Sequence, residues 1–421
     1  MKSLYLSKFD SECGNSYKYH FIPPSSLLDS KINRFRDEIV WPAGVKLSKS
    51  EKAEEVDCVI VGGGLAAITL ACYFYHVNID FVIVDPHERL AENFKNQVDR
   101  TNQRVMRSPY EHYVGCHRVY DYSLLDFAKI FYGKLSDIEK EQVILASAGH
   151  RGVVPIDIFL YHLMHQINAH ELSKRHYIGF AEEYSKEGEL FSIYLDSGHE
   201  IKSKFLVHAT GEKHKKIDFE SCNSYTWDSP HVSEITESKV LVVGAGQTAA
   251  NVTEMLIDNS CMVDIAFPGD EINFRCVDST PHFFRPAGRV EANLSGNTIK
   301  FPASMMLEYE EKFKNHEKNG YLRVIPNVSL VKDSEGKPVL QGLNNFSSVD
   351  RYDYIIQCLG LENNYTFTPK LPVSLDCSIS PNEYVIGANA REAVGPAARN
   401  IDGHRVAAER IVSSIIGKIG V

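Results

Sequence analysis

The segment Val56–Ala71 constrains this chain most, because an apolar run, three glycines and a run of small and apolar residues follow one another without a break. An apolar run rich in β-branched residues predicts a buried parallel strand. Gly62 and Gly64 then permit a tight turn and a close approach of the backbone to a pyrophosphate, and Ala67 lets the following helix pack close to the strand. The N-terminus of that helix would offer unpaired N–H groups to the phosphates. The segment therefore predicts a dinucleotide-binding unit.

A carboxylate stands where such a unit needs one. The second apolar run, Phe81–Val84, is followed by Asp85, which lies 21 residues beyond Gly64. A carboxylate at this position hydrogen-bonds the ribose hydroxyls of a bound dinucleotide. Strand, turn, helix and acid together strengthen the prediction of dinucleotide binding.

Length and composition narrow the remaining functions. The 421 residues suffice for two or three domains, and the formal net charge of −10 disfavours nucleic acid or an acidic membrane surface as the main partner. Nine cysteines without a C-x-x-C pair suit a reducing compartment. We see neither a signal-peptide pattern nor a run of the ~18 apolar residues that span a bilayer. We therefore expect a cytoplasmic protein without membrane insertion that acts on a small molecule; a homo-oligomer stays open.

A second segment, Lys239–Val252, repeats the strand–glycine–helix pattern. Gly244, Gly246 and Ala249 take the three small positions, and Thr248 stands in the first turn of the predicted helix. The repeat indicates that the chain binds two nucleotides.

The two units differ at the acid position. Counting 21 residues from Gly246 ends at Phe267, so a ribose-binding acid is missing where NADH would need one. Arg275 follows a few residues later and could hold a 2′-phosphate through a bidentate contact. Asp270 and Glu271 stand nearby and keep NADH open, but the pattern favours NADPH.

The stretch Asp99–Tyr110 is rich in side-chain donors, and two interpretations of it stay open. In the first, the stretch lines the cofactor and the catalytic cleft, with Arg107 and Ser108 on phosphate or ring oxygens and Asn102 near the reactive ring. In the second, it is a solvated loop held by ion pairs.

A predicted hairpin leads into the strand that closes the first unit. Phe191–Leu195 and the residues from Glu200 onward flank an Asp-Ser-Gly turn. The apolar strand that follows ends in Ala-Thr-Gly at Gly211, and a similar apolar strand ends at Gly360 after the second unit. Each unit is thus expected to end on a strand that terminates in glycine.

The C-terminal part predicts a return to the first unit. Glu383–Ala390, which contains Gly387 and Asn389, is a further strand ending in glycine. Gly395–Ile411, which contains Ala397, predicts a turn and a closing helix. The N-terminus of this helix either points at the ring of a bound cofactor, where it would stabilise negative charge, or simply packs on the sheet.

The two glycine motifs, their closing strands and the C-terminal return resemble the two-dinucleotide-binding-domain flavoproteins, over about residues 55–421. Within these, Gly244–Ala249 is similar to the NADPH motif of the class B flavin monooxygenases, which include the amine N-hydroxylases and the flavin-containing monooxygenases. His231 and Asn102 resemble the histidine that these families place ahead of this motif and the asparagine that they hold near the flavin. Where the family has Gly-Asp before the closing helix, this chain has Gly-Ala, so Asn389 would make the ribityl contact.

The resemblance implies an α/β fold of two Rossmann-like, three-layer domains, in which the FAD domain is interrupted by an inserted NAD(P)H domain. It divides the chain into an N-terminal extension (1–54), an FAD-binding domain (55–235 and 357–421) and an NAD(P)H-binding domain (236–356).

The resemblance also implies a monooxygenase activity. NADPH on the second domain would reduce FAD on the first, reduced flavin would trap O₂ as a C4a-hydroperoxide, and a substrate nitrogen, sulfur or carbon would take up its distal oxygen. Asn102 and Gln247 would lie near the flavin ring. The positions expected to bind the cofactors are Gly62, Gly64, Ala67, Asp85, Arg107, Ser108, Gly211, Gly244, Gly246, Thr248, Ala249, Arg275, Gly387, Asn389 and Ala397.

Two alternatives use the same fold. One is an NAD(P)H-dependent flavoprotein reductase or dehydrogenase, and the absence of C-x-x-C disfavours its disulfide-reducing form. The other is a protein that senses nucleotides without catalysis, which two intact glycine motifs make the weaker alternative.

Overall fold

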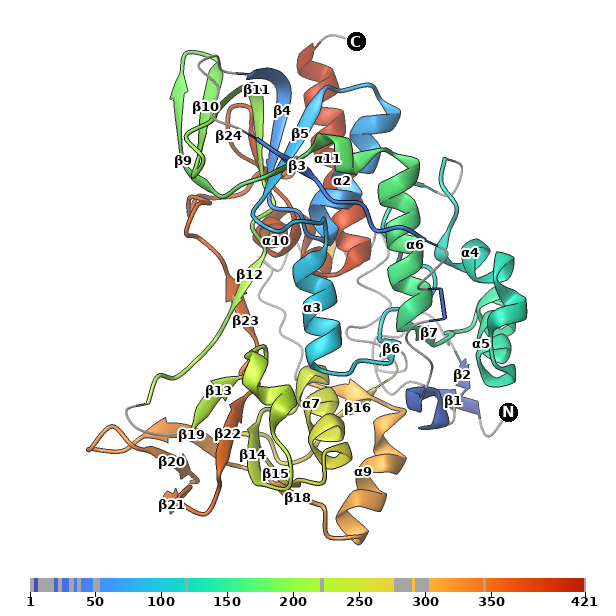
Figure 1. The fold of residues 1–421 in the computed structure, drawn as a ribbon, viewed down its shortest axis with the longest axis vertical. Coiled ribbons are helices and arrows are strands. Elements are labelled where there is room, and N and C mark those ends of the chain that lie inside the picture. Colours follow the sequence, from blue (N-terminus) through green and yellow to red (C-terminus); the bar gives the residue numbers. More distant parts are fainter. Residues whose placement is uncertain are drawn as a thin grey trace.

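The computed structural model describes residues 4–6, 19–21, 25–29, 34–35, 39–47, 54–117, 120–219, 223–275, 290–291, 303–343 and 346–419. Most of the predicted N-terminal extension lies outside these ranges. The described chain forms two lobes, each built on its own sheet, and two strands that run side by side join them (Figure 1).

The first lobe is organised on a nine-stranded sheet of order β24-β25-β11-β4-β5-β8-β3, with β10 paired to β11 and β9 paired to β10. β25, β11, β4, β5, β8 and β3 run parallel, while β9, β10 and β11 form an antiparallel meander that confirms the predicted hairpin. The strands are β3 (Val45–Lys46), β4 (Glu54–Val61), β5 (Phe81–Asp85), β8 (His176–Ile178), β9 (Ala181–Glu187), β10 (Leu190–Leu195), β11 (Glu200–His208), β24 (Ser378–Ser380) and β25 (Glu383–Val385).

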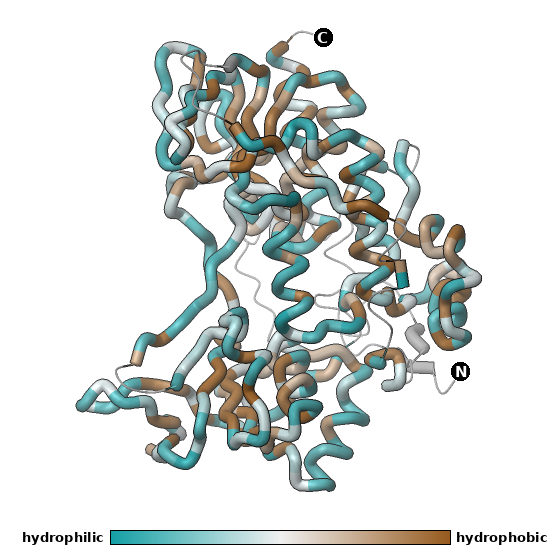
Figure 2. The backbone as a smooth tube through the Cα atoms, in the orientation of Figure 1, coloured by the Kyte–Doolittle hydropathy of each residue, from teal (hydrophilic) through white to brown (hydrophobic). Residues whose placement is uncertain are grey.

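Both faces of this sheet are covered, which explains why its central strands are apolar without interruption. On β4, Cys58 and Ile60 join the core formed with the helices, whereas Val59 and Val61 join a second core with Phe191 of the hairpin. Successive side chains of a strand point to opposite faces, so a strand buried on both faces needs apolar residues at every position. Figure 2 shows the resulting hydrophobic strands inside each lobe and the hydrophilic helices α3 and α9.

The helices of the first lobe cover the sheet and extend towards the second lobe. The crossover helix α2 (Leu65–His76) connects β4 to β5, and the closing helix α11 (Ile401–Ile419) packs against α2. A Ser136–Glu139 capping box starts α5. The other elements here are α3 (Glu92–Arg100), β6 (Val105–Met106), α4 (Leu124–Ile130), η2 (Tyr132–Lys134), α5 (Asp137–Ser147), β7 (Val154–Pro155), α6 (Ile156–Ala169), η3 (Leu172–Arg175), η6 (Gly387–Ala390), α10 (Arg391–Val394) and η7 (Pro396–Arg399), with the separate pair β1 (Leu4–Leu6) and β2 (Tyr19–Phe21). The short helix η1 (Ser25–Asp29) instead packs on α9 of the second lobe.

The second lobe contains a five-stranded parallel sheet of order β13-β22-β14-β15-β18. Its central strand, β14, is also buried on both faces. Val240 and Val242 face the core around α7, while Leu241 and Val243 face the small antiparallel sheet β19-β20-β21. The elements are β13 (Ser224–Thr226), η4 (Pro230–Glu234), β14 (Lys239–Val243), α7 (Gln247–Asp258), β15 (Met262–Ala266), β16 (Phe274–Arg275), β17 (Met305–Met306), α9 (Tyr309–Lys318), β18 (Leu322–Ile325), β19 (Ser329–Lys332), β20 (Pro338–Gln341), β21 (Phe346–Ser348) and β22 (Tyr354–Gln357).

The chain crosses between the lobes twice, and the two crossings pair with each other. β12 (Glu212–His214) and β23 (Leu361–Asn363) are antiparallel neighbours that run from one lobe to the other (Figure 1). Because β11 and β25 are neighbours in the first sheet, the whole second sheet is an insertion between them. β13 already belongs to this second sheet, so the sheet begins earlier in the chain than residue 236.

This topology confirms the predicted α/β fold of two Rossmann-like units, one inserted into the other. Among the described helices, none combines the length and the apolar character needed to cross a bilayer.

Candidate functional site

The first glycine turn leaves open space beside the N-terminus of α2. Gly62 has a φ of +110°, and a Cβ at this position would lie 2.3 Å from the carbonyl oxygen of Ala209. Gly64 directly precedes α2, and a Cβ on it would meet no atom within 4 Å. Ala67, in the first turn of α2, is fully buried. The turn therefore exposes backbone N–H groups at a helix N-terminus, where a pyrophosphate can approach.

Asp85 lies at the end of β5 and accepts hydrogen bonds beside this turn. Its Oδ2 accepts from the backbone N–H of Gly63 at 2.6 Å, and its Oδ1 accepts from the N–H of His87 at 2.9 Å and lies 2.7 Å from Nδ1 of the same histidine. Burial alone would raise the pKa of Asp85, but these hydrogen bonds outweigh it and lower the pKa below its usual value. Asp85 is thus a fixed, ionised acceptor at the position predicted to meet a ribose.

The C-terminal return comes back to the first turn. Gly387 has a φ of +76°, and a Cβ on it would lie 3.5 Å from the Cβ of Ala66. Asn389 is 7% exposed, and neither its amide nitrogen nor its amide oxygen has a hydrogen-bond partner among the described residues. An unsatisfied buried polar group costs about 1–3 kcal/mol. A polar ligand that reaches this amide would remove that cost.

Ala397 and Gly211 have backbone roles in the structure. Ala397 is buried in η7, and its carbonyl oxygen lies 1.9 Å from where a Cβ of Gly403 would stand, so the start of α11 packs tightly on η7. Gly211 has a φ of +70° where the chain leaves β11 for the first crossing, and its carbonyl accepts from the N–H of Asn364 at 3.3 Å.

The second glycine turn has the same local geometry and opens into a cavity. Gly244 has a φ of +136°, and a Cβ on it would lie 2.4 Å from the carbonyl oxygen of Cys358. Ala249, in the first turn of α7, is fully buried. A cavity of about 550 Å³ lies in front of the turn. Its lining includes Gly244, Gly246, Thr248, Phe267, Glu271 and Leu361.

Arg275 lies on β16, near this cavity but not in the wall described above. Asn273, two residues earlier, lines the cavity. Arg275 is half-buried, and its carbonyl accepts from the N–H of Leu307 at 3.1 Å. The proposed contact with a 2′-phosphate stays a prediction.

Gln247 is the first residue of α7 and holds a neighbouring strand. Its Oε1 accepts from the backbone N–H of Met306 at 2.8 Å, and its Nε2 donates to Oδ1 of Asn251 at 3.1 Å. Asn102 follows α3 in a left-handed conformation with a φ of 47° and lines a smaller cavity of about 160 Å³ together with Asn251 and Tyr309. The structure therefore brings both predicted catalytic residues to α7, where the lobes meet, and neither belongs to the described lining of the larger cavity.

Arg107 connects the two lobes. Its guanidinium donates to the carbonyl oxygen of Ser304 at 2.7 Å and to Oγ of the same residue at 2.8 Å. Ser108 is half-buried in the adjoining bend. In the structure, the donor-rich stretch thus binds the segment just before β17.

A buried ion pair reinforces this connection. Nη1 of Arg151 lies 2.6 Å from Oε1 of Glu308, and both side chains are almost fully buried. The segment 303–309 is therefore held by two arginines of the first lobe and by Gln247 and Asn251 of α7, the latter through a 2.6 Å hydrogen bond from Tyr309. Sequence reasoning missed Arg151 and Glu308, because 157 positions separate them and no local pattern marks either residue.

Comparison with known proteins identifies the fold. The chain matches no protein-family model and no curated protein sequence. Among solved structures, it is similar to the ornithine N-hydroxylase of Kutzneria sp. 744 in complex with reduced FAD, NADP⁺ and L-ornithine, with 13% identity, a TM-score of 0.68, and coverage of 87% of this chain and 100% of that one. The ornithine hydroxylase of Pseudomonas aeruginosa gives 14% identity, a TM-score of 0.67, and coverage of 87% and 100%.

A reductase is also similar. The bacillithiol disulfide reductase of Staphylococcus aureus aligns with 14% identity, a TM-score of 0.60, and coverage of 87% of this chain and 99% of that one. The fold is that of the two-domain FAD and NAD(P)H flavoproteins. At these identities the likeness establishes the fold and leaves the reaction to be argued from the site.

Proposed function

We propose that this chain is an FAD- and NADPH-dependent monooxygenase that oxygenates a small molecule through a flavin C4a-hydroperoxide. The observation that carries the proposal is the pair of open glycine turns on two separate sheets, in a chain that shares the fold of ornithine N-hydroxylases. Two turns of this kind suit a reaction in which one dinucleotide reduces another.

The first lobe fits FAD. The N–H groups at the start of α2 would bind the pyrophosphate beside Gly64, and Asp85 would accept from the ribose hydroxyls. The buried amide of Asn389 would find its partners on the ribityl chain or the ring. When bound, the flavin supplies the redox chemistry, and these residues bind and orient it. We assign residues 55–235 and 357–421 to this domain, with β13 contributing to the sheet of the other.

The second lobe fits NADPH. Gly246 and Thr248 would bind the pyrophosphate from the wall of the 550 Å³ cavity. Phe267 stands where a ribose-binding carboxylate would select NADH, so we propose that Arg275 selects the 2′-phosphate of NADPH. The inserted domain would comprise residues 236–356.

The segment 303–309 would fix the distance between the two cofactors. Arg107, Arg151 and Gln247 hold it from both lobes through the contacts described above. We propose that Gln247 and Asn102 act near the flavin ring from this junction. Since hydride transfer needs close and correct alignment, small shifts of this segment should lower the rate of flavin reduction.

The test is anaerobic reduction of the purified flavoprotein by NADPH and by NADH, followed by rapid mixing with oxygenated buffer. The proposal predicts faster reduction by NADPH and then a transient that absorbs in the near ultraviolet and differs from oxidised flavin. L-Ornithine is the first amine to try, because a similar structure contains it. A true substrate would speed the decay of the transient. Direct return to oxidised flavin, without the transient, would contradict the monooxygenase.

The similarity to a disulfide reductase supports a second candidate, an NAD(P)H-dependent reductase without its own disulfide centre. The described cysteines of the chain argue against a redox-active thiol, because all six are buried: Cys58, Cys72, Cys116, Cys261, Cys358 and Cys377. Burial raises the pKa of Cys58 and Cys358, which keeps them as unreactive thiols. Rapid direct reoxidation by a small acceptor such as a quinone, with no oxygen adduct, would favour this candidate.

A further inference from the structure

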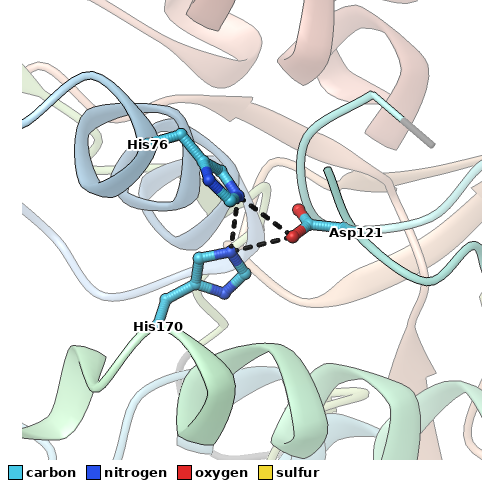
Figure 3. Close-up of side chains that lie close together, drawn as sticks. All are labelled: His76, Asp121 and His170. Carbon is cyan, nitrogen blue, oxygen red and sulfur yellow. Dashed lines mark hydrogen bonds and ion pairs between the residues drawn. The ribbon is translucent and has the colours of Figure 1, made fainter. Parts of the chain in front are cut away.

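Two histidines and an aspartate meet on the first lobe, away from both glycine turns. His76 is the last residue of α2, His170 follows the end of α6, and Asp121 lies in the loop before α4 (Figure 3). The Nε2 atoms of both histidines approach the same carboxylate oxygen, Asp121 Oδ1, at 3.1 and 3.0 Å, and lie 3.1 Å from each other. These three atoms form a nearly equilateral triangle.

Neighbouring groups orient two of the three side chains. Nδ1 of His170 lies 2.8 Å from the carbonyl oxygen of Gln166, which can only accept, so this nitrogen carries the hydrogen. In the neutral ring, Nε2 of His170 then carries no hydrogen, and its lone pair points towards Nε2 of His76 and Oδ1 of Asp121. The other carboxylate oxygen of Asp121 accepts from the backbone N–H of Cys116 at 2.7 Å, which turns Oδ1 towards the histidines. Such outer hydrogen bonds accompany histidine and carboxylate ligands of metal ions.

No arrangement of protons satisfies the three edges of the triangle. The two Nε2 atoms can carry at most two hydrogens, and the carboxylate oxygen carries none. If both nitrogens are protonated, two donors face each other at 3.1 Å. If only one is protonated, the other nitrogen and Asp121 Oδ1 face each other as two acceptors. A single cation inside the triangle would be attractive to all three atoms.

The geometry points to a binding site for a divalent transition-metal ion, with His76, His170 and Asp121 as ligands. Zinc binds imidazole nitrogen and carboxylate oxygen at about 2.0–2.2 Å, which places tetrahedral ligand atoms about 3.3 Å apart. The separations of 3.0–3.1 Å are close to this value. Two imidazoles and one carboxylate suit zinc and its first-row neighbours better than the hard cations Mg²⁺ and Ca²⁺.

The ion would have a structural role and leave one coordination position to water. The side chain of His76 is 27% exposed, whereas those of His170 and Asp121 are 3% and 5% exposed, so the open side faces solvent at His76. The ion would tie the ends of α2 and α6 to the loop before α4. Along α2, His76 lies about 18 Å from Gly64, so the site is separate from the predicted pyrophosphate and does not depend on the proposed activity.

The experiment is calorimetric titration of the chelator-treated, FAD-loaded protein with ZnCl₂, together with its thermal unfolding with and without zinc. Wild type should bind one tight equivalent and unfold at a higher temperature when zinc is present. H76Q and D121N should each weaken this binding at least about 100-fold. Both changes are conservative, and the amide oxygen introduced by D121N could still accept from the N–H of Cys116, so the variants should fold and stay yellow.

A matched control separates the site from ordinary surface histidines. H231Q removes a histidine whose side chain is 66% exposed and whose neighbour is a glutamate, and it should bind zinc as tightly as wild type. Equal binding by wild type, H76Q and D121N would overturn the inference, as would failure of wild type to bind zinc. Loss of tight zinc binding in H76Q and D121N, together with wild-type binding in H231Q, would establish the site.

Discussion

The two glycine turns have almost the same backbone and differ in what surrounds them. Gly62 N–H donates to Val84 O at 2.8 Å, and Gly244 N–H donates to Ala266 O at 2.9 Å. In each turn a Cβ on the glycine would collide with a carbonyl oxygen of the closing strand, at 2.3 and 2.4 Å. The spacing of small residues therefore dictates the turn, independently of which nucleotide it binds.

The difference begins at the end of the neighbouring strand. After β5 the chain places the ionised Asp85 against the turn, whereas after β15 it places Phe267, which is 2% exposed, in the wall of a cavity. A carboxylate favours a free ribose diol and repels a 2′-phosphate, while an apolar residue does neither. The residue that follows the neighbouring strand, and with it the proposed ribose selectivity, can therefore change while the turn stays the same.

The largest expected effects come from giving the turn glycines a side chain. In G62A and G244A, the new Cβ would collide with backbone and the positive φ would be strained, at a cost of about 1–3 kcal/mol in stability. G62A should purify without FAD. G244A should stay yellow but lose reduction by NADPH. Flavin absorbance measures the FAD content, urea unfolding the stability, and stopped-flow spectroscopy the rate of reduction by NADPH. A G244A protein that is folded but colourless would contradict the assignment of FAD to the first turn and NADPH to the second.

The next pair of variants separates binding from folding. Gly64 and Gly246 have ordinary negative φ values and open space around a Cβ. G64A and G246A should therefore unfold within about 0.5 kcal/mol of wild type. Each methyl group would instead stand where the pyrophosphate approaches, so G64A should lose FAD affinity and G246A NADPH affinity, both by tenfold or more. Wild-type affinity in either variant would show that its turn does not bind a pyrophosphate.

The sequence is sufficient to predict the parts of this fold that local patterns encode. The two turns, their strands and the hairpin at β10–β11 follow from short segments with their own periodicity, and the insertion of one sheet into the other follows from the resemblance to the two-domain flavoproteins. The contacts that the sequence does not disclose join distant segments. The donor-rich stretch around Arg107 leaves open both a segment that lines a ligand site and a loop held by ion pairs. Neither interpretation identifies Ser304, to which the guanidinium of Arg107 donates.

The same limit explains the missed histidine cluster. His112 and His117 stand close together in sequence, yet the cluster is formed by His76, Asp121 and His170, from the ends of two helices and a loop. No ligand spacing exists within any one segment. Only the fold brings the ends of α2 and α6 and the loop before α4 together, so a sequence pattern could not have marked these residues.

A smaller effect is expected from Arg275, which sharpens the comparison at the ribose. R275A should raise the KM for NADPH about tenfold or more and leave the KM for NADH nearly unchanged, because only NADPH carries the phosphate that a bidentate guanidinium would bind. R275K is the control, since it keeps the positive charge but cannot make the bidentate contact. Its KM for NADPH should lie between those of wild type and R275A. Steady-state reduction of an artificial acceptor measures both constants. Equal increases for both nucleotides would remove Arg275 from this role.

The smallest effect concerns the residues directly below the turns. His208, the last residue of β11, lies 2.8 Å from Glu383, whereas the matching last residue of β22 is Gln357, which cannot titrate. Burial alone would raise the pKa of Glu383, but hydrogen bonds with His208, Ser380 and Tyr184 lower it to about 2. A depressed carboxylate pKa stabilises the native state above the ordinary value of 4.5, and this contribution is lost as the pH falls from 4.5 towards 2.

E383Q should therefore be less stable than wild type at pH 6, and the gap in the free energy of unfolding should narrow as the pH falls through that window. Urea titrations at pH 6, 4 and 3 measure it. Q357N is the matched control in the other sheet: it removes hydrogen bonds to Ile217 and Ser224 and should lower stability by the same amount at each pH. A constant gap for E383Q would mean that the pKa of Glu383 is the same in the native and unfolded states. The stability contributed by Glu383 in the first sheet would then be as independent of pH as that contributed by Gln357 in the second.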